Sequence, residues 1–125
     1  MTFKFELVSP ERILVSEDVD QVVVPGEEGD FTVLTGHAPF VSTLRPGVLD
    51  VTGPGGRKRL LVKGGFAEVD PARLTILAER AYDVAEFEPA QIASELATAE
   101  IELAGAKDDE ARLRAYTLVE QLKAL

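Results

Sequence analysis

The chain has 125 residues, of which 46% are hydrophobic and 28% charged, a composition typical of a globular protein and not of a disordered one. It contains no cysteine, which excludes a disulfide framework and any thiolate metal site. The net charge of −9 opposes binding to nucleic acid or to an anionic membrane surface, so proteins are the expected partners.

The first two thirds of the chain are predicted to form short β-strands. Apolar residues alternate with polar ones in residues 3–7, and β-branched residues dominate the segments that follow. Glycine and proline mark turns at residues 25–30, 53–56 and 70–72, the second of which predicts a β-hairpin. Many short strands with regular turns favour a β-sandwich or a flattened barrel. The predicted strands are residues 3–7, 13–15, 21–24, 31–34, 48–51, 60–62, 66–69 and 74–77.

The last third of the chain has a helical period. Pro89 suits the first turn of a helix, and Gly105 a helix end. Asp108 or Asp109 is expected to cap a second helix. We therefore predict a β-sandwich domain over residues 1–84 and an antiparallel two-helix hairpin over residues 86–125, the overall class being β + α. The predicted apolar stripes are Ile92, Leu96, Ala99 and Leu103 on the first helix, and Ala111, Ala115, Leu118, Leu122 and Leu125 on the second.

Few residues are suited to catalysis or to cofactor binding. His37 is the only histidine, so a two-histidine metal motif is impossible, and a backbone-bonded loop residue is the expected role. No Gly-x-Ser-x-Gly elbow surrounds Ser9 or Ser42, and no glycine pair fits a phosphate loop. We expect no catalytic residue, no metal site and no cofactor. The start of the chain shows no basic and apolar leader, and no apolar run approaches the roughly 18 residues needed to cross a bilayer. A soluble, cytosolic protein is therefore expected.

The run from Gly29 to Val41, which contains Gly36-His37-Ala38-Pro39, resembles a signature of the epsilon subunits of bacterial F-type ATP synthases. Four further elements resemble that family in the same order and spacing: residues 7–12, 44–49, 63–69 and 74–81. The resemblance covers residues 3–82, whereas over residues 86–125 only the hairpin pattern and the length agree.

The resemblance implies a sandwich of about ten strands followed by a helical hairpin. It also implies a non-catalytic subunit that rotates with the c-ring, contacts the gamma subunit, and transmits torque to the catalytic alpha and beta subunits. Such a protein lies peripherally at the cytoplasmic face of the bacterial inner membrane, without inserting into it. The contact candidates that the resemblance implies are Glu27, Glu28, Asp30, His37, Ala38, Pro39 and Phe40. For Phe40, core packing remains an equal alternative.

In the same family the hairpin is a switch that docks on the sandwich or extends to obstruct rotation. The resemblance implies that Arg112, Arg114 and Lys123 of the second helix are the basic residues that would grip the beta subunit. Some members bind ATP through an I/L-D-x-x-R-A run, but here Gln91 and Ile92 replace its arginine and alanine. We therefore expect no ATP binding.

Two other classes of function remain open. One is a free-standing nucleotide-sensing or ligand-binding β-sandwich module, which a defined pocket near the hairpin would favour. The other is a hydrolase on a β-sandwich, against which the single histidine and the missing cysteine argue.

Overall fold

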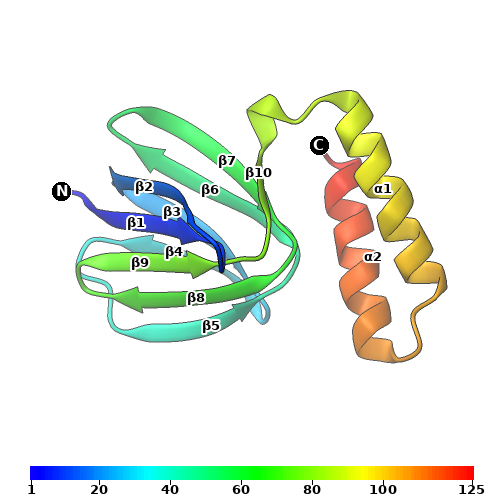
Figure 1. Cartoon of the computed structure of the whole chain (residues 1–125). Helices are drawn as coiled ribbons and strands as arrows, with labels where there is room; N and C mark the ends of the chain where they lie inside the picture. The colour runs from blue at the N-terminus through cyan, green and yellow to red at the C-terminus, as the bar shows by residue number, and fades with distance from the viewer.

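The computed structural model describes residues 1–125, which form a β-sandwich with two helices against one side (Figure 1). This confirms the predicted fold class. The strands are β1 (Phe3–Val8), β2 (Ile13–Val19), β3 (Gln21–Gly26), β4 (Gly29–Leu34), β5 (Phe40–Leu44), β6 (Gly47–Gly53), β7 (Gly56–Val62), β8 (Gly65–Asp70), β9 (Arg73–Leu77) and β10 (Ala81–Asp83). The helices are the 3₁₀ turn η1 (Val84–Glu86), α1 (Pro89–Ala104) and α2 (Asp109–Lys123).

All ten strands belong to one continuous sheet that curls into two layers. The strand order is β10-β7-β6-β3-β5-β8-β9-β1-β2, with β4 paired to β3, and only β1 and β9 run parallel. The far end of the sheet returns to its middle because β2 runs directly into β3, and at this junction the Asp20 N–H donates to the Thr52 carbonyl at 2.8 Å. A Cβ added at Gly53 would lie 3.2 Å from the Val19 Cα, so this close approach of β2 to β6 favours glycine.

The sandwich is held by a core of 17 buried apolar residues between its two layers. In β1 the side chains of Phe3, Phe5 and Leu7 point inward, in the alternation that the sequence predicts. No polar or charged residue is buried anywhere in the chain. The sandwich therefore depends on apolar packing and ladder hydrogen bonds, with no internal ion pair.

The three predicted turns join β3 to β4, β6 to β7, and β8 to β9. Two short strands, β5 and β10, were not among those predicted from local pattern. In β10 only three residues pair with β7, too few to show a period. The β5 sequence Phe-Val-Ser-Thr-Leu has apolar residues on both faces, and only its last residue is buried.

Helix α1 begins and ends, and α2 begins, where the sequence predicts, while α2 ends at Lys123, before the last residue of its predicted apolar stripe. Pro89 opens α1 and Gly105 caps its end, while the Asp108 carboxylate accepts the Ala111 N–H at 2.7 Å to cap α2. The helices pack against each other and against the outer side of the β6–β7–β10 layer. Their shared apolar cluster contains Leu61, Phe87, Ala99, Leu118, Val119 and Leu122.

Candidate functional site

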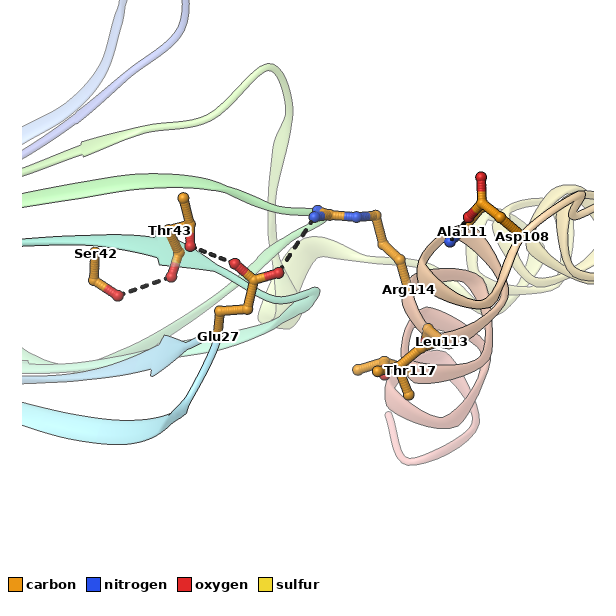
Figure 2. A network of polar contacts seen from close by, with 8 residues as sticks. All are labelled: Glu27, Ser42, Thr43, Asp108, Ala111, Leu113, Arg114 and Thr117. Atoms are coloured by element: carbon orange, nitrogen blue, oxygen red, sulfur yellow. Dashed lines mark hydrogen bonds and ion pairs between the residues drawn. The ribbon is translucent and has the colours of Figure 1, made fainter.

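The β3–β4 turn carries three exposed acids, Glu27, Glu28 and Asp30, at the edge of the sandwich nearest the hairpin loop. Figure 2 shows Glu27 between the two parts of the molecule. One of its carboxylate oxygens accepts the Thr43 hydroxyl, and the other lies 3.6 Å from Nη2 of Arg114 on α2. Glu27 is therefore engaged within the chain.

Asp30 is also engaged within the chain. The Arg45 guanidinium donates to its carboxylate and, through Nη1, to the Gly26 carbonyl at 2.6 Å. The two hydrogen bonds of Arg45 thus connect both strands of the turn to the loop between β5 and β6. Glu28 forms no ion pair or side-chain hydrogen bond and is the one acid of the turn that is free to meet another molecule.

The segment that carries His37 lies at the other end of β4 from the acidic turn. His37 is half-buried, and its Nδ1 lies 2.9 Å from the Ala38 carbonyl, while Ala38 and Pro39 are exposed. Phe40 is 45% exposed and packs edge-on against Phe31, with ring centroids 5.2 Å apart. The structure thus separates the seven contact candidates into two groups, and Phe40 lies at the rim of the core.

The three basic candidates of α2 have different surroundings. Arg112 pairs with Asp109 of its own helix at 2.9 Å, and Lys123 stands exposed in the last turn of α2. Only Arg114 reaches the sandwich. The structure therefore brings one of the three basic candidates to the acidic turn.

A second group of contacts fixes the start of the hairpin. Lys63 of the sandwich pairs with Glu95 of α1, and its Nζ lies 5.8 Å from the centre of the Tyr82 ring. The Tyr82 ring stacks on Phe87 with centroids 4.8 Å apart. A hydrogen bond with Tyr82 raises the pKa of Arg80. Sequence reasoning missed this group, because its members come from separate segments, at the end of β7, around β10 and in the first half of α1.

An exposed apolar row crosses the outer face of the sheet on the layer that the hairpin leaves bare. In register, Phe66 of β8 lies beside Leu77 of β9, then Val8 of β1 and Ile13 of β2. Phe66 is 45%, Leu77 47% and Ile13 58% exposed. A contiguous apolar patch of this kind marks an interaction site. The sequence held a signal, since apolar residues occupy outward positions of four strands, but only the register brings them together.

The largest groove, of about 950 Å³, lies at the seam between the sandwich and the hairpin. Its three cations are Lys63, Arg80 and Arg114. Carboxylates neutralise two of them, since Lys63 pairs with Glu95 and Arg114 with Glu27. The groove is therefore a poor anion site, and it lends little support to the ligand-binding alternative.

The structure holds no group of three or more histidine, aspartate or glutamate side chains placed to bind a metal. Neither α-helix combines the length and the apolar character that crossing a membrane requires.

Comparison with known proteins identifies the family. Residues 2–84 match the family model described as ATP synthase, Delta/Epsilon chain, beta-sandwich domain. The ATP synthase epsilon chain of Mesorhizobium japonicum is 50% identical over 98% of this chain and 92% of its own length. That of Maricaulis maris is 51% identical over 97% of this chain and 91% of its own.

Solved structures show the same fold. A chain of the Euglena gracilis mitochondrial ATP synthase, solved with its c-ring, aligns with a TM-score of 0.74 and 25% identity, over 98% of this chain and 78% of its own. A chain from the central stalk and c-ring of the Tetrahymena thermophila mitochondrial ATP synthase aligns with a TM-score of 0.71 and 14% identity, over 99% and 96%. The sequence matches, with the fold, establish that the chain belongs to the ATP synthase epsilon chain family, the non-catalytic epsilon subunits of the ATP synthase complex.

Proposed function

We propose that this protein is a central-stalk subunit that couples rotation of the c-ring to the catalytic alpha and beta subunits of a proton-translocating ATP synthase. The proposal rests on the sequence identity of 50% and 51% to two bacterial epsilon chains, in alignments that cover nearly the whole chain. The Tetrahymena relative lies in a central stalk with a c-ring, which supports the same placement. The protein then works at the cytoplasmic face of the bacterial inner membrane, held there by its partners.

The sandwich suits the transmission of torque. Its ten strands form one continuous sheet folded into two layers, so a twist applied at one strand strains ladder hydrogen bonds along the sheet. The core between the layers consists of interdigitated apolar side chains, which compress little. A force applied at the partner contacts is thus passed on by the domain as a nearly rigid body.

The acidic turn is the proposed contact with the c-ring. Its acids present negative charge at one end of the sandwich, where basic and polar groups of a partner can meet them. Arg45 holds the turn in shape through Asp30, and Glu28 extends from it without a partner. Of the three acids, Glu28 is therefore the one best placed for a contact outside the chain.

The apolar row is the proposed contact with the gamma subunit. Burial of Phe66, Leu77 and Ile13 against a partner would remove three large half-exposed side chains from water. The hairpin packs on the other layer, over Leu61 of β7 and Val48 of β6, and Arg114 is the one hairpin residue that shares a groove with Phe66 and Leu77. The row therefore stays largely accessible while the hairpin is docked.

The hairpin is the proposed regulator of ATP hydrolysis. Lys123 and Arg112 are available to an acidic beta-subunit segment, because neither contacts the sandwich. Arg114 becomes available only when its contact with Glu27 breaks. Inhibition through all three residues therefore needs the hairpin to leave its docked position.

The proposal is tested by co-purification of the full chain with the gamma subunit and the remaining stalk. We expect Phe66→Glu to reduce recovery with gamma, because it places a charge inside the proposed apolar contact. Leu34→Glu is the matched control, since Leu34 is 51% exposed but lies on β4, away from the row. Equal recovery of the two variants would exclude the row as the gamma contact, and a chain that never joins the complex would contradict the stalk placement.

The regulatory part is tested separately in the assembled enzyme. A chain that ends at residue 84 is expected to fold, to bind gamma and to allow faster ATP hydrolysis than the full chain. An unfolded fragment would contradict the domain boundary. A folded, assembled fragment that leaves the hydrolysis rate unchanged would contradict the inhibitory role.

A further inference from the structure

The docked hairpin is held unevenly along its length. At the end where the chain enters and leaves it, Phe87, Leu118 and Leu122 are buried in the apolar cluster that also contains Leu61. At the loop end, no residue from 104 to 114 is buried. Apolar packing against the sandwich is thus confined to one half of the hairpin.

At the loop end, the contact between α2 and the acidic turn is polar. Nη2 of Arg114 lies 3.6 Å from the Glu27 carboxylate, and Figure 2 shows the arginine extended across the gap between α2 and the turn. Its other nitrogen, Nη1, passes over Gly64, where a Cβ would lie 3.0 Å away. Below this bridge remains an open cavity of about 210 Å³, which is lined in part by Leu113, Thr117 and Arg45. The loop end is bridged to the sandwich without being packed against it.

Glu27 is in turn oriented from the sandwich side. The Thr43 hydroxyl on β5 donates to the oxygen that Arg114 does not contact. This second bond fixes the direction of the carboxylate, so that its remaining oxygen faces α2. A carboxylate held in this way loses less side-chain freedom when it forms the ion pair.

We infer that Glu27 and Arg114 form a latch that closes the loop end of the hairpin on the sandwich, and that the hairpin opens from this end first. The apolar cluster at the other end acts as the hinge side, because separating it exposes Leu118, Val119 and Leu122 together. The inference deepens the proposed function, since the latch lies in the turn proposed to face the c-ring. A cationic group that engages Glu27 there competes with Arg114 and loosens the loop end.

The latch is tested in the isolated full chain, where no ring is present, so the result does not depend on the proposed c-ring contact. Hydrogen exchange is followed by mass spectrometry for residues 112–117 and, separately, for residues 118–123. A short helix freed from its support is marginally stable, so opening of one end appears as faster exchange there. Two pairs of variants carry the test: Glu27→Gln with its control Glu28→Gln, and Arg114→Gln with its control Arg112→Gln.

We expect Glu27→Gln and Arg114→Gln each to speed exchange in residues 112–117 by about two- to fivefold, the range that an exposed ion pair supports. The two control variants and residues 118–123 should change less. Exchange of the unmodified chain in 1 M salt should approach that of Glu27→Gln, because salt screens the pair. The double variant Glu27→Gln with Arg114→Gln should exchange no faster than either single variant, because both remove the same ion pair.

Three results would overturn the latch. The first is equal exchange in Glu27→Gln and Glu28→Gln. The second is a loosening that spreads evenly over residues 112–123, which would mean that the hairpin opens as one unit. The third is a double variant, Glu27→Gln with Arg114→Gln, whose effect on exchange is the product of the two single effects, since residues that act through one shared ion pair are not additive.

Discussion

The sandwich and the hairpin bury their apolar residues in different ways. The sandwich encloses 17 of them between two layers of its own sheet. The hairpin buries Ala99 alone from the 16 residues of α1, and Ala115, Leu118, Val119 and Leu122 from α2, between the two helices and against the outside of the sandwich. One part of the molecule thus encloses its own core, whereas the other is docked on the outside of that part.

Because of this difference, we expect a substitution in the sandwich core to destabilise the whole molecule and one in the cluster under the hairpin to destabilise the hairpin alone. A change inside the sandwich weakens everything, because the hairpin docks on the sandwich. We expect a change in the apolar cluster under the hairpin to release the helices and to leave the two layers of the sandwich packed. The variants below are chosen to break or sharpen that contrast, from the largest expected effect to the smallest.

Phe5→Ala should have the largest effect. Phe5 is fully buried in the sandwich core, and truncation of a buried phenylalanine costs about 3–5 kcal/mol through lost contacts and the cavity that remains. We expect one cooperative unfolding transition at a much lower denaturant midpoint. Phe40→Ala is the control at a half-exposed phenylalanine, and an equal loss in both variants would contradict the core that the structure shows.

Leu122→Ala should have an effect of about 2–5 kcal/mol on docking of the hairpin, with little change in the sandwich itself. Leu122 is fully buried between the helices and the sandwich, and Leu113, 66% exposed on the same helix, is the matched control. Hydrogen exchange should become faster throughout α1 and α2, while β1 and β9 keep their protection. If β1 and β9 lost protection as well, the two parts would form a single cooperative unit.

Reversal of a charge in the acidic turn should have a smaller effect, which is measured as coupling and complex stability in the assembled enzyme. Asp30→Lys should lower coupling and complex stability more at low salt than at high salt, because salt screens contacts between exposed charges. This variant also removes the bond to Arg45, so Glu28→Lys separates the two causes. Glu28→Lys should show the same salt dependence without disturbing the turn. Normal coupling of both variants at every salt concentration would mean that the turn does not face the ring.

Acid should weaken the sandwich slightly through Asp50. Arg57 donates two hydrogen bonds to this carboxylate, at 2.9 and 2.6 Å, and thereby lowers the pKa of Asp50. A carboxyl with a lower pKa in the folded state stabilises the fold above its unfolded pKa, and this contribution is lost as pH falls through the folded value. The free energy of unfolding, measured by denaturant titration from pH 5 down to pH 2, should therefore fall less steeply for Asp50→Asn than for the unmodified chain. Parallel curves would show that the pair contributes nothing.

Addition of ATP to the isolated chain should have no effect. The position that holds arginine in ATP-binding relatives is Gln91, whose side-chain oxygen accepts the Glu88 N–H at 2.9 Å at the start of α1. A neutral amide committed to a helix cap lacks the fixed donors that a guanidinium offers to phosphate. Calorimetric titration should detect no saturable binding. Binding tighter than about 1 mM, or roughly 4 kcal/mol, would contradict this expectation.

The sequence by itself determined the elements with a clear local pattern. Alternation in β1, the glycine-rich turn at residues 53–56, Pro89 at the start of α1 and Asp108 at the cap of α2 all act through the residues next to them. These interactions depend on backbone preferences and on near neighbours, so they can be derived before any tertiary contact is known. The order and spacing of the family motifs likewise lie in the sequence alone.

Tertiary structure alone decided how those elements combine. The apolar row joins Ile13, Phe66 and Leu77 through the register of four strands. Glu27 pairs with Arg114 on a helix far along the chain, and Asp30 pairs with Arg45. Of three acids that look alike in the sequence, Glu28 alone is left without a partner. The short strands β5 and β10 form because neighbouring strands offer unpaired edges to them. Register, edge pairing and ion pairs between distant segments depend on positions in space, and the local order of residues does not contain them.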